Sequence, residues 1–108
     1  MLMLRPIALA SIFLSSQLPA AYAARIRMNI YRHTFAAVCP ADDETIIYRL
    51  EVRSRSMIHV EHIKTATALI KKGWHEQIAD HLAERLGGDQ TITAVHQGVE
   101  IETVRLSG

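Results

Sequence analysis

The sequence predicts an α+β domain in which four antiparallel strands form one sheet and two helices cover one face of it. Two kinds of periodicity lead to this prediction. Apolar residues alternate with polar ones, with period two, in four segments, at residues 25–38, 45–55, 90–96 and 99–106. Apolar residues recur at helical spacing in two segments between the second and third of these, at 63–72 and 75–86. The order of elements is therefore β-β-α-α-β-β, which is typical of a sheet with helices on one side.

The first two strands are expected to form a hairpin. In 45–55 the apolar residues Ile46, Tyr48, Leu50 and Val52 alternate with charged ones, so that one face is buried and the other is wet. In 25–38 the alternation predicts an apolar face made of Ile26, Met28 and Ile30. Pro40 and the acidic run 42–44 predict the turn between the two strands.

Each helix has an apolar stripe and a glycine at its end. In 63–72 the stripe consists of Ile63, Ala66, Leu69 and Ile70, and Lys71 and Lys72 are expected at the negative end of the helix, before Gly73. In 75–86 the stripe is Ile78, Leu82 and Leu86, followed by Gly87 and Gly88.

The last two strands are expected to join through a tight turn at Gln97 and Gly98, because glycine accepts the positive φ that such a turn requires. A four-stranded sheet has two unpaired edges, and the charged face of 45–55 has no helix to cover it. The charged face is therefore either in contact with solvent or lines a passage between copies that join edge to edge. We favour the second arrangement, a homo-oligomer, because it would pair the two free edges.

The N-terminus has two interpretations. Residues 1–23 combine one positive charge, an apolar run and an Ala-x-Ala site, the pattern of a cleaved secretory signal, which leaves a domain at 24–108 and places the protein in the periplasm or outside the cell. The apolar run is too short to form a stable membrane span. In the alternative, Met28 is the true start and the protein is cytoplasmic.

Charge and cysteine content restrict the partners. Residues 24–108 carry equal numbers of acidic and basic side chains, which argues against nucleic acid as a partner. Cys39 is the single cysteine, so an intramolecular disulfide is excluded. It is a packing residue, an intermolecular pairing site or a reactive thiol.

Short motifs resemble a known family. Val38-Cys39-Pro40, Trp74-His75-Glu76-Gln77 and Gly98-Val99-Glu100-Ile101 look like a shortened nitrile reductase of the queuosine pathway, a tunnelling-fold enzyme that reduces 7-cyano-7-deazaguanine with NADPH. The block 76–80 also resembles GTP cyclohydrolase I, a relative with the same fold. That enzyme needs two cysteines and a histidine for zinc, and the single cysteine here argues against this activity.

The resemblance implies roles for individual residues. Cys39 takes the nucleophile position, and His75 and Asp43 take proton-handling positions, although the loop after the cysteine is shorter than in the reductase. Glu76 takes the place of the carboxylate that anchors the N–H edge of a purine, with Glu61 and Trp74 as further substrate contacts. The ligand would be a purine- or pterin-like heterocycle bound between subunits, and NADPH is implied only if the activity is reductive.

Structural interpretations of the same residues remain open. An acid in the first turn of a helix, such as Glu76, stabilises the positive helix end whatever its function. The spacing of His59, Glu61 and His62 matches no standard zinc pattern, so no metal site is expected. The competing function is a non-catalytic exported module whose sheet edges and polar face serve self-assembly or protein binding.

Overall fold

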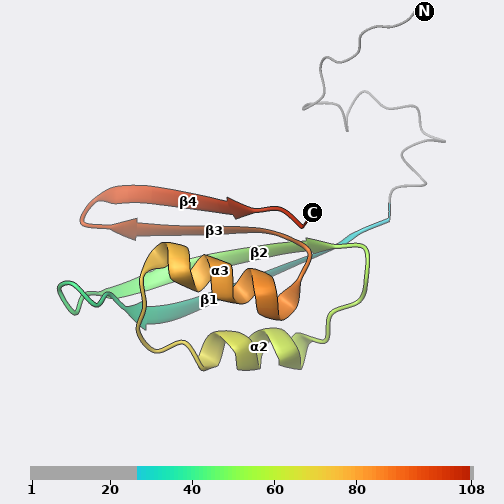
Figure 1. Cartoon of the computed structure of the whole chain (residues 1–108), viewed down its shortest axis with the longest axis horizontal. Helices are drawn as coiled ribbons and strands as arrows, with labels where there is room; N and C mark the ends of the chain where they lie inside the picture. The colour runs from blue at the N-terminus through green and yellow to red at the C-terminus, as the bar shows by residue number, and fades with distance from the viewer. Residues whose placement is uncertain (1–26, 108) are drawn as a thin grey trace, which may run out of the picture.

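Strong β-formers and two short amphipathic helices give the element order that the sequence predicts (Figure 1). The computed structural model describes residues 27–107, so the predicted signal segment 1–23 lies outside the described residues. The elements are β1 (Asn29–Val38), β2 (Thr45–Ser54), α2 (Val60–Ala68), α3 (His75–Leu86), β3 (Asp89–His96) and β4 (Val99–Arg105). Between residues 27 and 107 no helix is long and apolar enough to cross a membrane.

The four strands form one antiparallel sheet in the order β1-β2-β3-β4. Figure 1 shows both helices on the same side of this sheet. The central pair, β2 and β3, provides the floor of the core, with Tyr48, Val52 and Ile92 almost completely buried. Leu82 of α3 is fully buried against this floor. The predicted α+β architecture is confirmed.

The face of β1 that packs on the core differs from the prediction. Ile30 was expected to point inward, but 47% of it is exposed, and it pairs with Arg53 across the hairpin. Residues that are paired across two strands share a face. Tyr31 is paired with buried Val52, so Tyr31, and with it Phe35, lies on the core side. Met28 and Ile30 therefore gave the wrong face, and Ile26, the third residue of the predicted face, lies outside the described residues.

The first helix begins at Val60, three residues before the predicted start, and ends before the predicted residue 72. It ends at Ala68, and Leu69, which was expected in the apolar stripe, is exposed. Lys71 and Lys72 therefore do not occupy a helix end, and Gly73 does not end a helix. Instead the chain runs along the edge of the sheet, where the N–H of Val38 donates to the carbonyl of Lys71 at 2.9 Å. Pairing with β1 satisfies backbone groups that a longer helix would have used.

The second helix has the predicted bounds, and a buried side chain from the sheet stabilises its end. Gln90 of β3 donates from Nε2 to the carbonyls of Leu82 and Gly87, at 3.0 and 2.7 Å. The carbonyl of Gly87, the C-cap residue, lies beyond the last helical N–H, so the side chain of Gln90 provides a partner that the helix cannot. The contact fixes α3 relative to β3.

The second hairpin turns at Gln97 and Gly98, as predicted. Both residues have positive φ, 50° and 81°, as a two-residue turn of type I′ requires.

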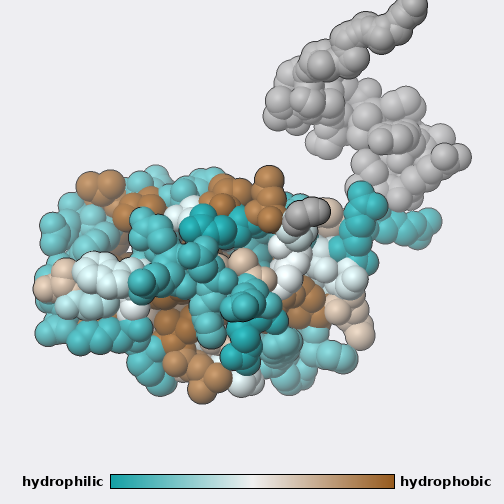
Figure 2. Space-filling model, viewed as in Figure 1, coloured by the Kyte–Doolittle hydropathy of each residue, from teal (hydrophilic) through white to brown (hydrophobic). Residues whose placement is uncertain are grey.

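The sheet face opposite the helices is open in the described part of the chain, as predicted. It carries an ion-pair network in which Glu51 accepts hydrogen bonds from Arg32 at 3.0 Å and from Arg53 at 2.5 Å. Apolar side chains also remain exposed on and after β4, and Figure 2 shows apolar atoms gathered over this strand; they belong to Val99, Val104 and Leu106. β1 and β4 are the two edges of the sheet.

Candidate functional site

A cavity of about 200 Å³ lies where the core face of the sheet meets the start of α3. Its floor is formed by Tyr48 of β2 and Ala94 of β3. Functional side chains from three separate parts of the chain surround it, namely Cys39, Trp74, His75, Glu76 and His96. The cavity therefore brings together four residues that the sequence analysis named as site residues.

The turn after β1 places Cys39 in the wall of the cavity. The N–H of Cys39 donates to the carbonyl of Glu44 at 2.8 Å, and the N–H of Asp43 donates to the carbonyl of Cys39 at 2.9 Å. Asp43 has a φ of 60°, in the left-handed region that aspartate tolerates better than most residues. The side chain of Cys39 is 3% exposed, so only molecules that enter the cavity reach its sulfur.

The segment Trp74-His75-Glu76 forms the opposite wall because α3 begins there. Trp74 is the N-cap residue and has an extended backbone, and its carbonyl accepts the first helical hydrogen bond, from the N–H of Ile78 at 2.9 Å. The side chain of Trp74 is 47% exposed, and Glu76 follows in the first helical turn. The helix start thus presents a ring and a carboxylate at the mouth of the cavity.

His75 is buried and has a free ring nitrogen. Its Nε2 atom has no hydrogen-bond partner among residues 27–107, although the residue is only 9% exposed. Its ring lies 5.4 Å from that of Tyr48, at a tilted angle. Burial lowers the pKa of His75, against smaller opposite effects from Glu76 and from a backbone hydrogen bond with Ile92. The imidazole is therefore neutral at neutral pH.

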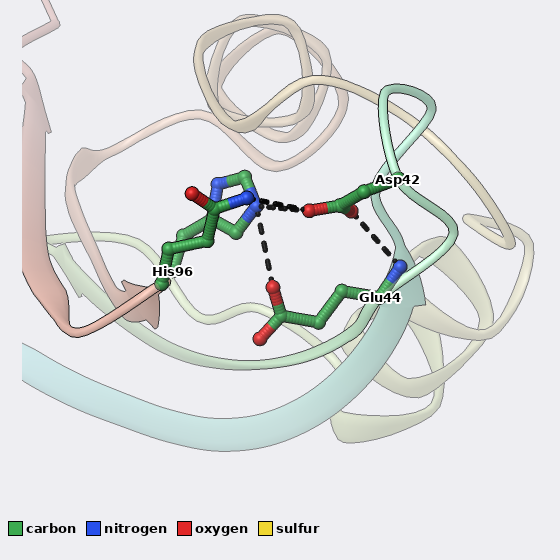
Figure 3. A network of polar contacts seen from close by, with 4 residues as sticks. Asp42, Glu44 and His96 are labelled. Carbon is green, nitrogen blue, oxygen red and sulfur yellow. Dashed lines mark hydrogen bonds and ion pairs between the residues drawn. The ribbon is translucent and has the colours of Figure 1, made fainter.

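A polar cluster closes the cavity near Cys39 (Figure 3). Asp42 accepts hydrogen bonds from the backbone N–H of Glu44 at 3.0 Å and from Nε2 of Gln97 at 2.8 Å. Nε2 of His96 lies 3.3 Å from Asp42 and 3.4 Å from the carboxylate of Glu44. The hydrogen bonds from Glu44, Gln97 and His96 hold the pKa of Asp42 well below its ordinary value.

Two residues with predicted roles do not line this cavity. Asp43 is exposed and forms an ion pair with Lys72 at 3.2 Å. Glu61 is exposed in the first turn of α2. Asp42, rather than Asp43, has a carboxylate oxygen within 4.8 Å of the sulfur of Cys39.

Sequence reasoning missed His96 as a site residue. It ends β3 and pairs with Val99 across the second hairpin. Only the register of both hairpins brings it to the turn after β1, and no local motif marks it. Among the described residues, Cys39, Asp42 and His96 are also the one group whose ligand atoms are close enough to hold a metal ion.

The comparisons with known proteins identify the fold. A crystal structure of the archaeosine synthase QueF-like, in the apo form, is similar to this chain with a TM-score of 0.64 and 19% sequence identity. The similarity covers 77% of this chain and 95% of that one. No protein-family model and no curated protein matches the sequence. The chain therefore has the tunnelling fold that the sequence motifs predicted.

Proposed function

We propose that this tunnelling-fold protein binds a purine- or pterin-like heterocycle in the cavity between Cys39 and Glu76. The observation that carries the proposal is the convergence of Cys39, Trp74 and Glu76 on one cavity. Its volume of about 200 Å³ is below the range of roughly 300–1,000 Å³ that is common for drug-sized ligands, and it suits one small fused ring system.

The polar groups of the cavity complement the edge of such a ring. The carboxylate of Glu76 accepts hydrogen bonds from ring and exocyclic N–H groups. His75 also lines the cavity, and its buried Nε2 has no hydrogen-bond partner among residues 27–107, so a ligand that reached this atom would recover about 1–3 kcal/mol. Two such contacts favour a heterocycle with several hydrogen-bonding atoms over an apolar molecule.

Aromatic side chains suit the faces of the ring. Trp74 lines the cavity and remains half exposed, and Tyr48 forms part of the floor. An exposed indole next to a small cavity provides a surface on which a planar ligand stacks. The similar structure is of an archaeosine synthase, and this supports a nucleoside-related ligand class.

The thiol of Cys39 provides the chemistry in this proposal. Its sulfur adds to an electrophilic carbon of the ligand, such as the carbon of a nitrile. A carbon–sulfur bond forms, one π bond of the nitrile breaks, and the thiol proton ends on the nitrile nitrogen. This addition needs no further reactant. Reduction beyond it would take a hydride from NADPH, as the resemblance to the reductase implies.

The ligand site is completed at an interface between subunits in this proposal. Trp74 and Ile101 both line the cavity, and the β4 edge to which Ile101 belongs has no partner strand within the described chain. Edges with exposed apolar residues favour association with another copy. A homo-oligomer would cover the half-exposed indole and enclose the ring.

Calorimetric titration with guanine, pterin and 7-cyano-7-deazaguanine tests the proposal. We expect wild-type protein to bind at least one of them, and Glu76→Gln to bind it about tenfold or more weakly, since a hydrogen bond to a charged group contributes about 1.5–3 kcal/mol. Glu84→Gln is the matched control, because Glu84 is an exposed acid on the same helix. Equal affinity of the Glu76→Gln and Glu84→Gln variants, or no binding by the wild type, would reject the proposed site.

The alternative function is a non-catalytic exported module for self-assembly or protein binding. The exposed apolar residues of the β4 edge favour it. Cell compartment separates the two functions, because NADPH and purine precursors are cytosolic. The measurement that distinguishes them is the intact mass of the untagged protein from separated fractions of its native host. A chain that begins at Ala24 in an exported fraction favours the module. A chain that begins at Met28 in the cytosol favours heterocycle binding.

A further inference from the structure

We infer that Cys39, Asp42 and His96 form a binding site for a divalent transition-metal ion of the zinc class. One thiol sulfur, one carboxylate oxygen and one imidazole nitrogen from these residues lie within 4.8 Å of one another. Zinc binds these three donor types at about 2.0–2.3 Å, so that tetrahedral ligand atoms are about 3.3–3.8 Å apart. The distance of 3.3 Å between Asp42 and His96 already falls in this range.

The donor atoms are held in place by the fold. The turn of residues 39–44 fixes Cys39 and Asp42 through backbone hydrogen bonds, and Gln97 donates to the same carboxylate oxygen of Asp42 that His96 approaches. His96 is the last residue of β3, so the sheet fixes its backbone. Ligands that are positioned before the ion arrives lose little conformational entropy when it binds. The three donor atoms, which lie within 4.8 Å of one another, would move closer together around an ion.

The electrostatics of the cluster favour a cation. The carboxylates of Asp42 and Glu44 both face His96, and no lysine or arginine among the described residues forms an ion pair with either of them. The nearby Lys72 pairs with Asp43 instead. The carboxylate of Asp42 beside the thiol opposes the formation of a thiolate, whereas a metal ion compensates both negative groups.

The donor set also indicates the class of ion. A thiolate and an imidazole together select zinc and similar transition metals over Mg²⁺ or Ca²⁺, which prefer oxygen ligands. Three protein ligands leave a fourth position, where Glu44 or a molecule in the adjacent cavity would bind. Cys39 cannot act as a free nucleophile while it is a ligand, so a bound ion would block the addition step proposed above.

Titration of the untagged, reduced full-length protein with Co²⁺ tests the site. We expect a thiolate-to-cobalt charge-transfer band in the near ultraviolet that saturates at one ion per chain. Cys39→Ser should abolish the band, and Asp42→Asn and His96→Gln should each weaken binding about tenfold or more. His59→Ala is the matched control, because His59 is an exposed histidine outside the cluster. Far-ultraviolet circular dichroism checks that each variant is folded.

The result that overturns the inference is the absence of a charge-transfer band at stoichiometric Co²⁺, or a band of equal affinity in wild type, Asp42→Asn and His96→Gln. In either case the cluster is a hydrogen-bonded turn only. The titration contains no heterocycle, so its outcome is independent of the proposed function. Heterocycle binding is measured separately, in the presence of a chelator. Either result can be negative while the other is positive.

Discussion

Val38 and Lys72 are paired as an isolated parallel bridge, although one ends β1 and the other precedes α3. The N–H of Val38 donates to the carbonyl of Lys71 at 2.9 Å, and the N–H of Gly73 donates to the carbonyl of Val38 at 3.1 Å. The bridge therefore joins the residue before Cys39 to the segment before Trp74. This pairing of two backbones builds the cavity, because the thiol and the start of α3 would otherwise belong to unconnected loops.

Stability should fall as the pH is lowered through about 6.5 because of His75. Burial lowers the pKa of His75 from its ordinary 6.5 in the folded protein. Below pH 6.5 the unfolded chain therefore binds a proton at His75 that the folded protein does not bind. The stability that depends on the neutral ring is complete above this pH and is lost as the pH falls. Urea unfolding at several pH values should show that the free energy of unfolding depends less steeply on pH in His75→Gln than in wild type.

The control for this prediction is His81→Gln, since His81 is an exposed histidine on the same helix. It should keep the wild-type slope. A His75→Gln variant with the same pH dependence as the wild type would show that the buried ring does not remain neutral.

Gly88→Ala should destabilise the protein more than Gly87→Ala. Both glycines have positive φ, 73° and 71°, so that alanine is strained at either position. A Cβ at Gly88 would also lie 2.8 Å from the carbonyl oxygen of Arg53, whereas nothing lies within 4 Å of a Cβ at Gly87. The additional loss should be about 1–3 kcal/mol in the free energy of unfolding, measured with urea. Equal losses would mean that the approach of β2 to this turn is looser than the structure shows.

Asp42→Asn should increase the rate at which iodoacetamide alkylates the protein in the presence of a chelator. The reagent attacks the thiolate form, and a nearby carboxylate disfavours a thiolate. A carboxylate oxygen of Asp42 lies within 4.8 Å of the sulfur of Cys39, whereas Asp43 is paired with Lys72. Mass spectrometry should therefore show faster alkylation of Asp42→Asn, and an unchanged rate for the control Asp43→Asn. Equal rates for both variants would place the carboxylate of Asp42 away from the sulfur in solution.

Most of the fold could be predicted from the sequence because periodicity is a local property. The alternation in β2 and the stripe of α3 each report one buried face, and both predictions are confirmed. The face of β1 could not be read in this way, because apolar residues occur on both of its faces and only the pairing of Tyr31 with Val52 decides between them. The early end of α2 depends likewise on its competition with an edge bridge.

The candidate site was predictable where a motif is contiguous. Cys39 and the segment 74–76 were named from short motifs, and the structure brings them to one cavity. His96 and Asp42 are 54 residues apart in the sequence and lie at the turns of two different hairpins, yet their side chains are in contact. No single-sequence pattern reports such a contact, since it follows from the combined register of four strands.

Protection of Cys39 by a ligand shows whether the cavity itself binds a heterocycle. Alkylation by iodoacetamide would be followed by intact mass in a chelator, with increasing concentrations of the heterocycle that binds in calorimetry. Alkylation should slow in proportion to occupancy in wild type and in Glu84→Gln, and Glu76→Gln should need about tenfold more ligand for the same effect. Alkylation of the wild type at an unchanged rate under saturating ligand would contradict the account, because the ligand would then bind elsewhere.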